Sequence, residues 1–210
     1  GPDSFVRAAG LAVTTAPLAP DMVGGGAWNF TSLPPLASII NYGTLQANDG
    51  GSLHLIAEKI FNHGLLTAPD GNVGLYAGKS VLLSERPDGR GLSAQVTLPE
   101  GTVDNHGRIV ADAGTVALHA RVVNQGGTIQ ANTVRNVGGV IELVASESVN
   151  LQAGSAISAQ GVESGARGGE VRLKSDGAFT DAAGSSINVS GSSTGGDGGR
   201  VALSAPQMSE

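Results

Sequence analysis

The chain has 210 residues, with 33 glycines, no cysteine, only four Phe, two Tyr and one Trp, and a formal net charge of −6 at pH 7. Its 40% of apolar residues can bury a core, which excludes a disordered segment of low hydrophobicity. The lack of cysteine excludes disulfides and thiolate metal sites, and no apolar run approaches the ~18 residues that a membrane-spanning helix needs. We therefore expect no insertion into a membrane and, because the charge is negative, no nucleic-acid partner.

Residues 1–37 and the short tail 206–210 lack the repeat that organises residues 38–205. Residues 5–13 alternate in the manner of a strand, and residues 18–35 contain prolines, a run of three glycines and two aromatic residues. Such a segment can fold over the side or the end of a repeat domain, whose terminal strand edges need a cap. We expect an N-terminal strand followed by a capping or extra-helical segment.

Two short patterns alternate along residues 38–205. The first pattern is Gly-x-[Leu/Val/Ile]-x-Leu-x-[Ala/Ser], and its copies are 51–57, 71–77, 114–120, 139–145, 169–175 and 199–205. The second pattern is Asn-x-Gly-x-[Leu/Ile]-x-Ala, and its copies begin at Asn41, Asn62, Asn105 and, with one inserted glycine, Asn124. The alternation of apolar and polar residues predicts strands of about four to six residues, separated by turns at Gly and Asn.

The shared Leu of the first pattern recurs at steps of 20, 43, 25, 30 and 30 residues. A coil of short strands with this period is typical of a parallel β-helix, in which equivalent residues stack ~4.8 Å apart. We therefore predict an all-β, parallel β-helix whose Val and Leu rows fill the interior, right-handed by the general rule for parallel crossovers. The side chains expected to hydrogen-bond along the stack are those of the turn residues Asn41, Asn62, Asn105 and Asn124.

The 43-residue step is explained by an insertion at residues 84–104, which match neither pattern. Residues 87–89 mark a tight turn, and the apolar residues after it alternate like a strand. We predict an extra-helical β-hairpin that leaves the coil, so that the rungs of Asn62 and Asn105 become direct neighbours. The alternative to a presented, partner-binding hairpin is one that only shields the side of the β-helix. The polar tip, our candidate contact with a partner, consists of Arg86, Asp88 and Arg90.

Three apolar residues, Ile56, Tyr76 and Val144, fall on positions that face outward if the alternating leucines face the interior. An apolar outer row indicates either a binding surface or a surface that another part of the same chain covers. We expect residues 18–35 or the hairpin to cover this row.

The histidines and carboxylates do not form a recognisable catalytic or metal-binding set. His63 and His106 occupy the same place in two Asn-His-Gly turns and should stack one rung apart, but no third ligand repeats with them. His54 and His119 lie at other outward positions, with no repeated Ser or Asp beside them. No outer row collects the carboxylates that a β-helical polysaccharide hydrolase or lyase would need. We expect no catalytic residue, no metal and no cofactor, so a carbohydrate-active enzyme is the least favoured function.

The two alternating patterns, followed by Gly-Gly-rich turns, together resemble the filamentous haemagglutinin family of two-partner secretion exoproteins. The resemblance covers residues 38–205 and implies a right-handed β-helix that a bacterium exports through an outer-membrane transporter pore. The family includes adhesins, haemolysins and contact-dependent growth-inhibition proteins. Its secretion domain carries Asn-Pro-Asn motifs near the N-terminus. Since this chain has no Asn-Pro, it resembles the end of that domain and the β-helical repeats beyond it.

The resemblance implies a segment of a secreted or cell-surface exoprotein that acts in adhesion, biofilm formation or cell–cell contact. Its partners would be the transporter pore and a host-cell, bacterial or matrix receptor, either glycan or protein, and the segment itself would be monomeric. The alternative is a non-binding structural or secretion-folding module of a larger toxin or contact-dependent inhibition protein.

Overall fold

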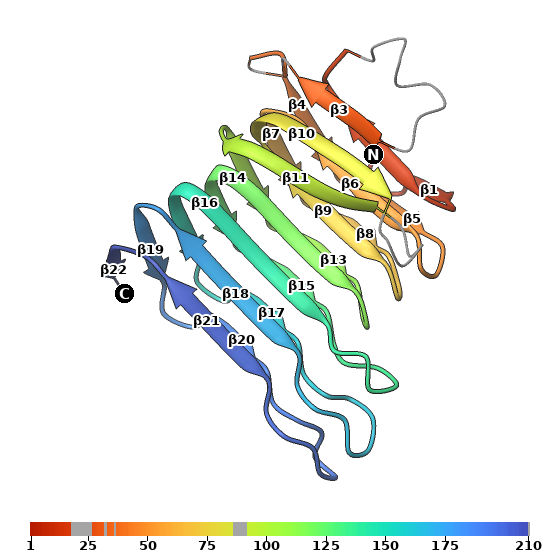
Figure 1. Ribbon diagram of the computed structural model, residues 1–210, viewed down its shortest axis with the longest axis vertical. Coiled ribbons are helices and arrows are strands. Elements are labelled where there is room, and N and C mark those ends of the chain that lie inside the picture. Colours follow the sequence, from red (N-terminus) through yellow and green to blue (C-terminus); the bar gives the residue numbers. More distant parts are fainter. Residues whose placement is uncertain (18–26, 32, 36, 86–91, 210) are drawn as a thin grey trace.

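The structure, a computed structural model, describes residues 1–17, 27–31, 33–35, 37–85 and 92–209. Their regular elements are β-strands, and none of the described segments forms a helix long and apolar enough to cross a membrane. The strands wind into rungs that lie side by side from the N-terminal to the C-terminal end (Figure 1), and successive rungs pair in parallel. The predicted all-β, parallel β-helix is confirmed.

One face of the coil is a single parallel sheet with one strand from each rung. In spatial order its strands are β1 (Phe5–Ala8), β5 (Thr44–Ala47), β8 (Leu65–Thr67), β13 (Arg108–Val110), β15 (Thr128–Gln130), β17 (Ala156–Ser158) and β20 (Ser186–Asn188). The register places one apolar residue of each strand in a continuous inner row, which comprises Val6, Leu45, Leu66, Ile109, Ile129, Ile157 and Ile187. The sequence patterns predicted this stacking because each strand contributes the same alternating position.

The second sheet covers the other two faces of the coil. Its first face consists of β2 (Leu11–Thr14), β6 (Ser52–Ile56), β9 (Asn72–Tyr76), the first halves of β14 (Thr115–Gln125) and β16 (Val140–Leu151), β18 (Glu170–Ser175) and β21 (Arg200–Ser204). The other face consists of β4 (Ser38–Asn41), β7 (Lys59–Asn62), β12 (Thr102–Asn105), the second halves of β14 and β16, β19 (Ala178–Asp181) and β22 (Gln207–Ser209). The register shifts between Ala120 and Val122, at the junction between the portions of β14 that pair on the two faces.

The interior is a set of aliphatic rows with almost no exposed surface. Two of these rows on the first face are Leu53, Val73, Val116, Ile141 and Val171, and Leu55, Leu75, Leu118, Leu143 and Leu173. Burying a side chain of this size contributes about 1.5–3 kcal/mol relative to leaving it exposed. The equivalent residues Val201 and Leu203 are exposed, because among the described strands β21 pairs only with β18.

The coil extends beyond residues 38–205 in both directions. Strand β1 pairs with β5, and β2 pairs with β6, so residues 5–14 form the first rung. Residues 207–209, at the expected tail, form β22 and pair with β19. Only β3 (Ala27–Thr31) of the N-terminal segment takes an extra-helical position among the described strands before residue 38.

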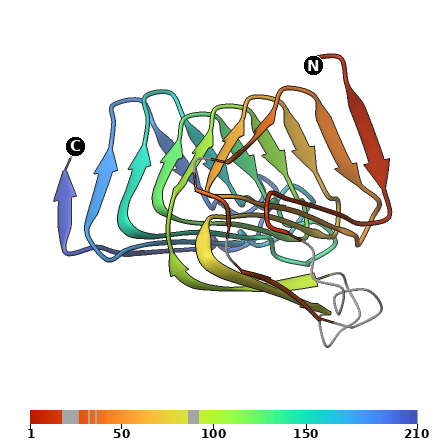
Figure 2. The same cartoon turned by 90° about the horizontal axis from the view of Figure 1, so that it is seen from above.

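An antiparallel sheet of three strands lies against the outside of the coil (Figure 2). It consists of β11 (Leu92–Pro99), β10 (Gly78–Glu85) and β3, in that order. The predicted hairpin is therefore present, but its strands span residues 78–99 rather than lying within 84–104. Strand β10 follows β9 with only Ala77 between them, and the coil resumes at Thr102 with β12. As predicted, the rungs on either side of the hairpin are direct neighbours, since β7 pairs with β12.

The three-stranded sheet, which we call the cover sheet, buries the apolar outer row. Ile56 and Tyr76 are 0% and 4% exposed, and they pack with Phe30, Val81 and Leu83 of the cover sheet. The expectation that an excursion covers this row is confirmed for Ile56 and Tyr76. The third member of the row, Val144, is half-buried.

Candidate functional site

The turn asparagines form a buried row of side-chain hydrogen bonds. Asn41 Nδ2 donates to Asn62 Oδ1 at 2.9 Å, and Asn62 Nδ2 donates to Asn105 Oδ1 at 2.8 Å. Asn105 Nδ2 donates in turn to Gln125 Oε1 at 2.8 Å, and Gln125 Nε2 donates to the carbonyl of Gly127 at 2.8 Å. Each amide thus satisfies the next one along the stack, which is how buried polar groups avoid the cost of lost hydration.

Asn124 was expected in this row, and the structure places Gln125 there instead. The register pairs Asn105 with Gln125 and Asp104 with Asn124. The physical reason is the glycine inserted before Thr128, which shifts the turn by one residue, and a shift of one residue moves a side chain to the opposite face of a strand. Asn124 lies in a half-buried outer row, where it donates to Asp104 and accepts from Asn150 Nδ2 at 2.8 Å.

The candidate partner-contact residues Arg86, Asp88 and Arg90 lie outside the residues that the structure describes. The described parts of the hairpin, β10 and β11, form the cover sheet with β3. Its attachment to the coil includes a hydrogen bond of 2.8 Å from Ser146 Oγ to the carbonyl of Pro99.

Aromatic side chains cross the covered face from one rung to the next. The Tyr76 ring stacks on the His54 ring, with the two ring centroids 5.7 Å apart. Tyr76 and His119 meet in an edge-to-face contact, with their ring centroids 5.6 Å apart. Tyr76 leans over Gly74, where a Cβ atom would overlap the tyrosine ring. Glycine at this position is therefore required by the packing of Tyr76, and this pairing was not foreseen from the sequence.

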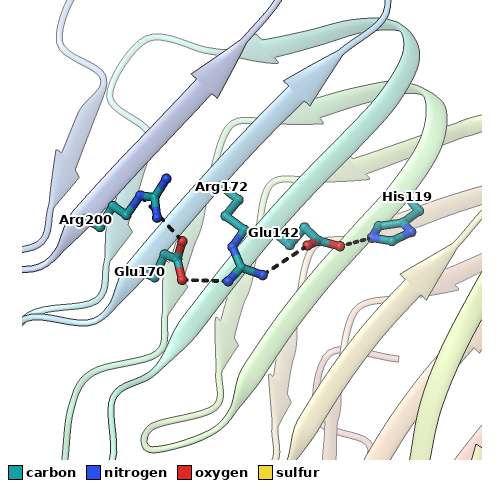
Figure 3. A network of polar contacts seen from close by, with 5 residues as sticks. All are labelled: His119, Glu142, Glu170, Arg172 and Arg200. Atoms are coloured by element: carbon teal, nitrogen blue, oxygen red, sulfur yellow. Dashed lines mark hydrogen bonds and ion pairs between the residues drawn. The ribbon is translucent and has the colours of Figure 1, made fainter.

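A polar network runs from His119 toward the C-terminal rungs of the coil (Figure 3). His119 Nε2 lies 2.8 Å from Glu142 Oε1, and Arg172 Nη1 lies 3.8 Å from the other Glu142 oxygen. Arg172 Nη2 also donates to Glu170 Oε2 at 2.7 Å, and Arg200 Nε lies 4.0 Å from Glu170 Oε1. Charges of opposite sign alternate along the network from Glu142 through Arg172 and Glu170 to Arg200. The network links four successive strands, β14, β16, β18 and β21, without presenting a surface of one sign.

The environment of these groups shifts their pKa values in directions that follow from burial and charge. The hydrogen bond from His119, assisted by Arg172, holds the pKa of Glu142 below its usual range. Burial lowers the pKa of His54 to about 4, and neither of its ring nitrogens has a hydrogen-bond partner among the described residues. Burial, with a contribution from Glu142, raises the pKa of the Tyr76 phenol. His54 and Tyr76 are therefore neutral at pH 7, as buried groups without an ionic partner should be.

The sequence predicted where most of these aromatic and polar residues lie on the outside of the coil, but not which of them are in contact. It predicted outward positions for His54, Tyr76 and His119. The strand registers place His54 in one outer row with Glu142 and Arg172, and place Tyr76 and His119 in the next row. It did not indicate that His119 contacts Glu142 in the neighbouring row. The strand pattern shows which row a residue belongs to, but not the direction in which a long side chain extends. Within the described residues, no group of three or more His, Cys, Asp or Glu gathers around a common point.

This chain is similar to a known protein in its structure and not in its sequence. The sequence matches no protein-family model and no curated protein. In structure, the chain is similar to the HMW1 secretion domain from Haemophilus influenzae, with a TM-score of 0.74 and 21% sequence identity. The match covers 100% of this chain and 73% of that chain. The resemblance to secreted β-helical exoproteins is thus confirmed at the level of the fold: the chain has the β-helical fold of a solved bacterial secretion domain.

Proposed function

We propose that this chain is a secretion and folding module of a bacterial exoprotein exported by a two-partner pathway. The observation that carries the proposal is the likeness of the whole chain, at a TM-score of 0.74, to a domain whose described role is secretion. The partner would be an outer-membrane transporter pore, and the exported protein would be released or held at the cell surface. We infer that the module acts as a monomer.

The architecture suits export of an unfolded chain that folds as it emerges. Each strand of the coil pairs only with strands of the neighbouring rungs, for example Leu143 with Leu118 before it and Leu173 after it. A new rung can therefore form on the previous one as soon as 20–30 further residues are available. Without cysteine, no disulfide can form and lock a folded state before export.

An export assay tests this proposal. Residues 1–210 would be placed between a secretory signal peptide and a reporter enzyme, and expressed with and without the outer-membrane transporter encoded beside the parent exoprotein. We expect the reporter in the medium only when the transporter is present. Retention of the reporter in the periplasm despite the transporter would contradict the proposal.

A matched variant separates folding from recognition by the transporter. Leu118→Asp combined with Leu143→Asp places charges in the buried Leu row and should prevent rung formation. If folding outside the cell draws the chain through the pore, this variant should be exported less than the unchanged module. Equal export of both chains would show that the rungs are dispensable for secretion.

Adhesion is the second candidate function, through contact of the hairpin tip with a glycan or protein receptor on a host cell, another bacterium or the matrix. The cover sheet is built from β10 and β11, so removing the whole hairpin would also expose Ile56 and Tyr76. The sharper variant replaces only residues 86–91 with a Gly-Ser link. Binding to cells or to a glycan panel that is lost in this variant would support an adhesive tip, and binding that persists would contradict it.

A further inference from the structure

One turn of the coil carries an exposed row of ring side chains. The rings belong to Tyr42, His63 and His106, which directly follow Asn41, Asn62 and Asn105 of the buried amide row. In the next two rungs the same position is occupied by Gly126, which follows Gln125, and by Gln152, which follows Leu151. The ring centroids of Tyr42 and His63 are 5.0 Å apart with an interplanar angle of 11°. Those of His63 and His106 are 5.5 Å apart with an angle of 7°. The predicted stacking of the two histidines one rung apart is confirmed, and both side chains are exposed.

The backbone beneath the two imidazoles is tightly fixed. The amide of His63 donates to the carbonyl of Asn41 at 2.8 Å, and the amide of His106 donates to the carbonyl of Asn62 at 2.8 Å. The buried amide row, which includes Asn62 and Asn105, lies directly behind these turns. The separation of the two histidines is therefore set by the rung spacing and not by a mobile loop.

A third polar group lies near His106, on the side of the following rungs and away from His63. Gly126 occupies the next position of the row and has no side chain. A Cβ atom built on Gly126 would overlap both Gln152 Oε1 and His106 Nδ1, so these two atoms converge on the space above the glycine. The position of this oxygen was not foreseen from the sequence, because Gln152 belongs to a turn without the Asn-His-Gly pattern.

We propose that His63 and His106 bind one divalent transition-metal ion of the Cu²⁺, Ni²⁺ or Zn²⁺ class, with the Gln152 amide oxygen near His106 and water completing the coordination. Neutral imidazole is a preferred ligand of these ions. Metal–nitrogen bonds of about 2.0–2.1 Å require the two ligand nitrogens to approach within about 4 Å of each other. The stacked rings need only tilt toward each other to reach this distance, and exposed side chains can do so.

Such an ion would join two rungs whose histidines are 43 residues apart in the chain. They are neighbours only because the hairpin of β10 and β11 leaves the coil between them. The ion would therefore cross-link the two rungs between which the hairpin leaves the coil. A ligand that binds only the folded state raises its stability in proportion to the logarithm of ligand concentration. The metal site does not depend on the proposed role in export, so either proposal can fail without affecting the other.

Isothermal titration of the full chain with CuCl₂ and with NiCl₂ at neutral pH tests the site. We expect one ion per chain, a rise in the thermal midpoint with added metal, and loss of both effects in His63→Gln and in His106→Gln. Tyr42→Phe keeps the ring stack and should bind as the unchanged chain does. His119→Gln removes a histidine outside the row and should also leave binding intact.

Circular dichroism without metal checks that each variant folds, and the Cu²⁺ electron paramagnetic resonance spectrum should show coupling to two nitrogens. Gln152→Ala should weaken binding several-fold without abolishing it. Absence of binding by the unchanged chain, equal binding by the double variant of His63 and His106, or loss in only one of the two single variants would overturn the proposal.

Discussion

Two buried polar residues of this coil, Asn62 and His54, differ in whether their side chains are hydrogen-bonded. Asn62 has no exposed surface, and its amide is bonded on both sides within the buried amide row. His54 is 1% exposed and sits beneath the cover sheet without a hydrogen-bond partner for its ring among the described residues. The first residue is satisfied and the second is not. They should therefore respond differently to substitution and to pH.

Replacing Asn62 with Ala should lower the free energy of unfolding by about 2–3 kcal/mol, since it leaves the side-chain oxygen Oδ1 of Asn105 buried without its donor. Asn124→Ala is the matched control, because Asn124 lies in the half-buried outer row and its partners can turn to water. Its cost should be about 1 kcal/mol or less. Urea unfolding of both variants measures the difference. If both substitutions lowered the free energy of unfolding equally, Asn124 would belong to the buried amide row, and the placement of Gln125 there would be wrong.

The stability of the chain should fall as the pH drops from about 6.5 to about 4. In the unfolded chain His54 takes up a proton near its ordinary pKa of 6.5, whereas the folded state resists protonation until about 4. The unfolded state thus binds more protons in this window, which costs up to about 3 kcal/mol at its lower end. The lowered pKa of Glu142 adds a loss in the same direction at still lower pH.

His54→Phe keeps a ring against Tyr76 but removes the titrating group. Urea midpoints measured at intervals between pH 7 and pH 4.5 should therefore fall less steeply for this variant than for the unchanged chain. Parallel curves for the two proteins would show that His54 is not the source of the acid sensitivity.

At the scale of elements, the cover sheet should behave as a unit that can open without unfolding the coil. Its apolar contact with the coil rests on Phe30, Val81 and Leu83 against Ile56 and Tyr76. The coil beneath has its own separate interior of aliphatic rows. Elements with few buried contacts open at a lower free energy than the core.

Phe30→Ala should destabilise the cover sheet by about 3–5 kcal/mol, because Phe30 is almost fully buried in the contact with the coil. Hydrogen exchange should accelerate in β3, β10 and β11 while the coil strands β14 and β16 stay protected. Thr31→Ala, at the exposed neighbouring position of β3, is the control and should leave exchange unchanged. Uniform acceleration over the whole chain would show that cover and coil unfold together.

At the scale of the whole molecule, the rungs form a nearly one-dimensional array in which position along the axis sets the cost of a substitution. Leu118 is fully buried between rungs on both sides, and the equivalent Leu203 in the last rung is 40% exposed. Leu118→Ala should cost about 2–5 kcal/mol, and Leu203→Ala about 1 kcal/mol or less. Thermal unfolding of the two variants compares them. Similar costs would contradict the difference in burial between Leu118 and Leu203.

The sequence by itself determined the coil. Its local alternation and repeat spacing specify which residues face inward, which rows they form, and that His63 lies beside His106. These features depend on neighbours one rung away, and the same pattern repeats in each rung. The sequence also placed a hairpin between Asn62 and Asn105, because the repeat is interrupted there.

Only the tertiary structure decided where the excursions lie and what they bury. A strand alternates with period two whether it belongs to the coil or to the cover sheet, so the pattern could not show that β10 starts at Gly78 or that β3 joins it. The same limit applies to Gln125 in place of Asn124 and to Gln152 above Gly126. In each case the outcome depends on register and on the direction in which a side chain leans, which are set by contacts between segments far apart in the chain.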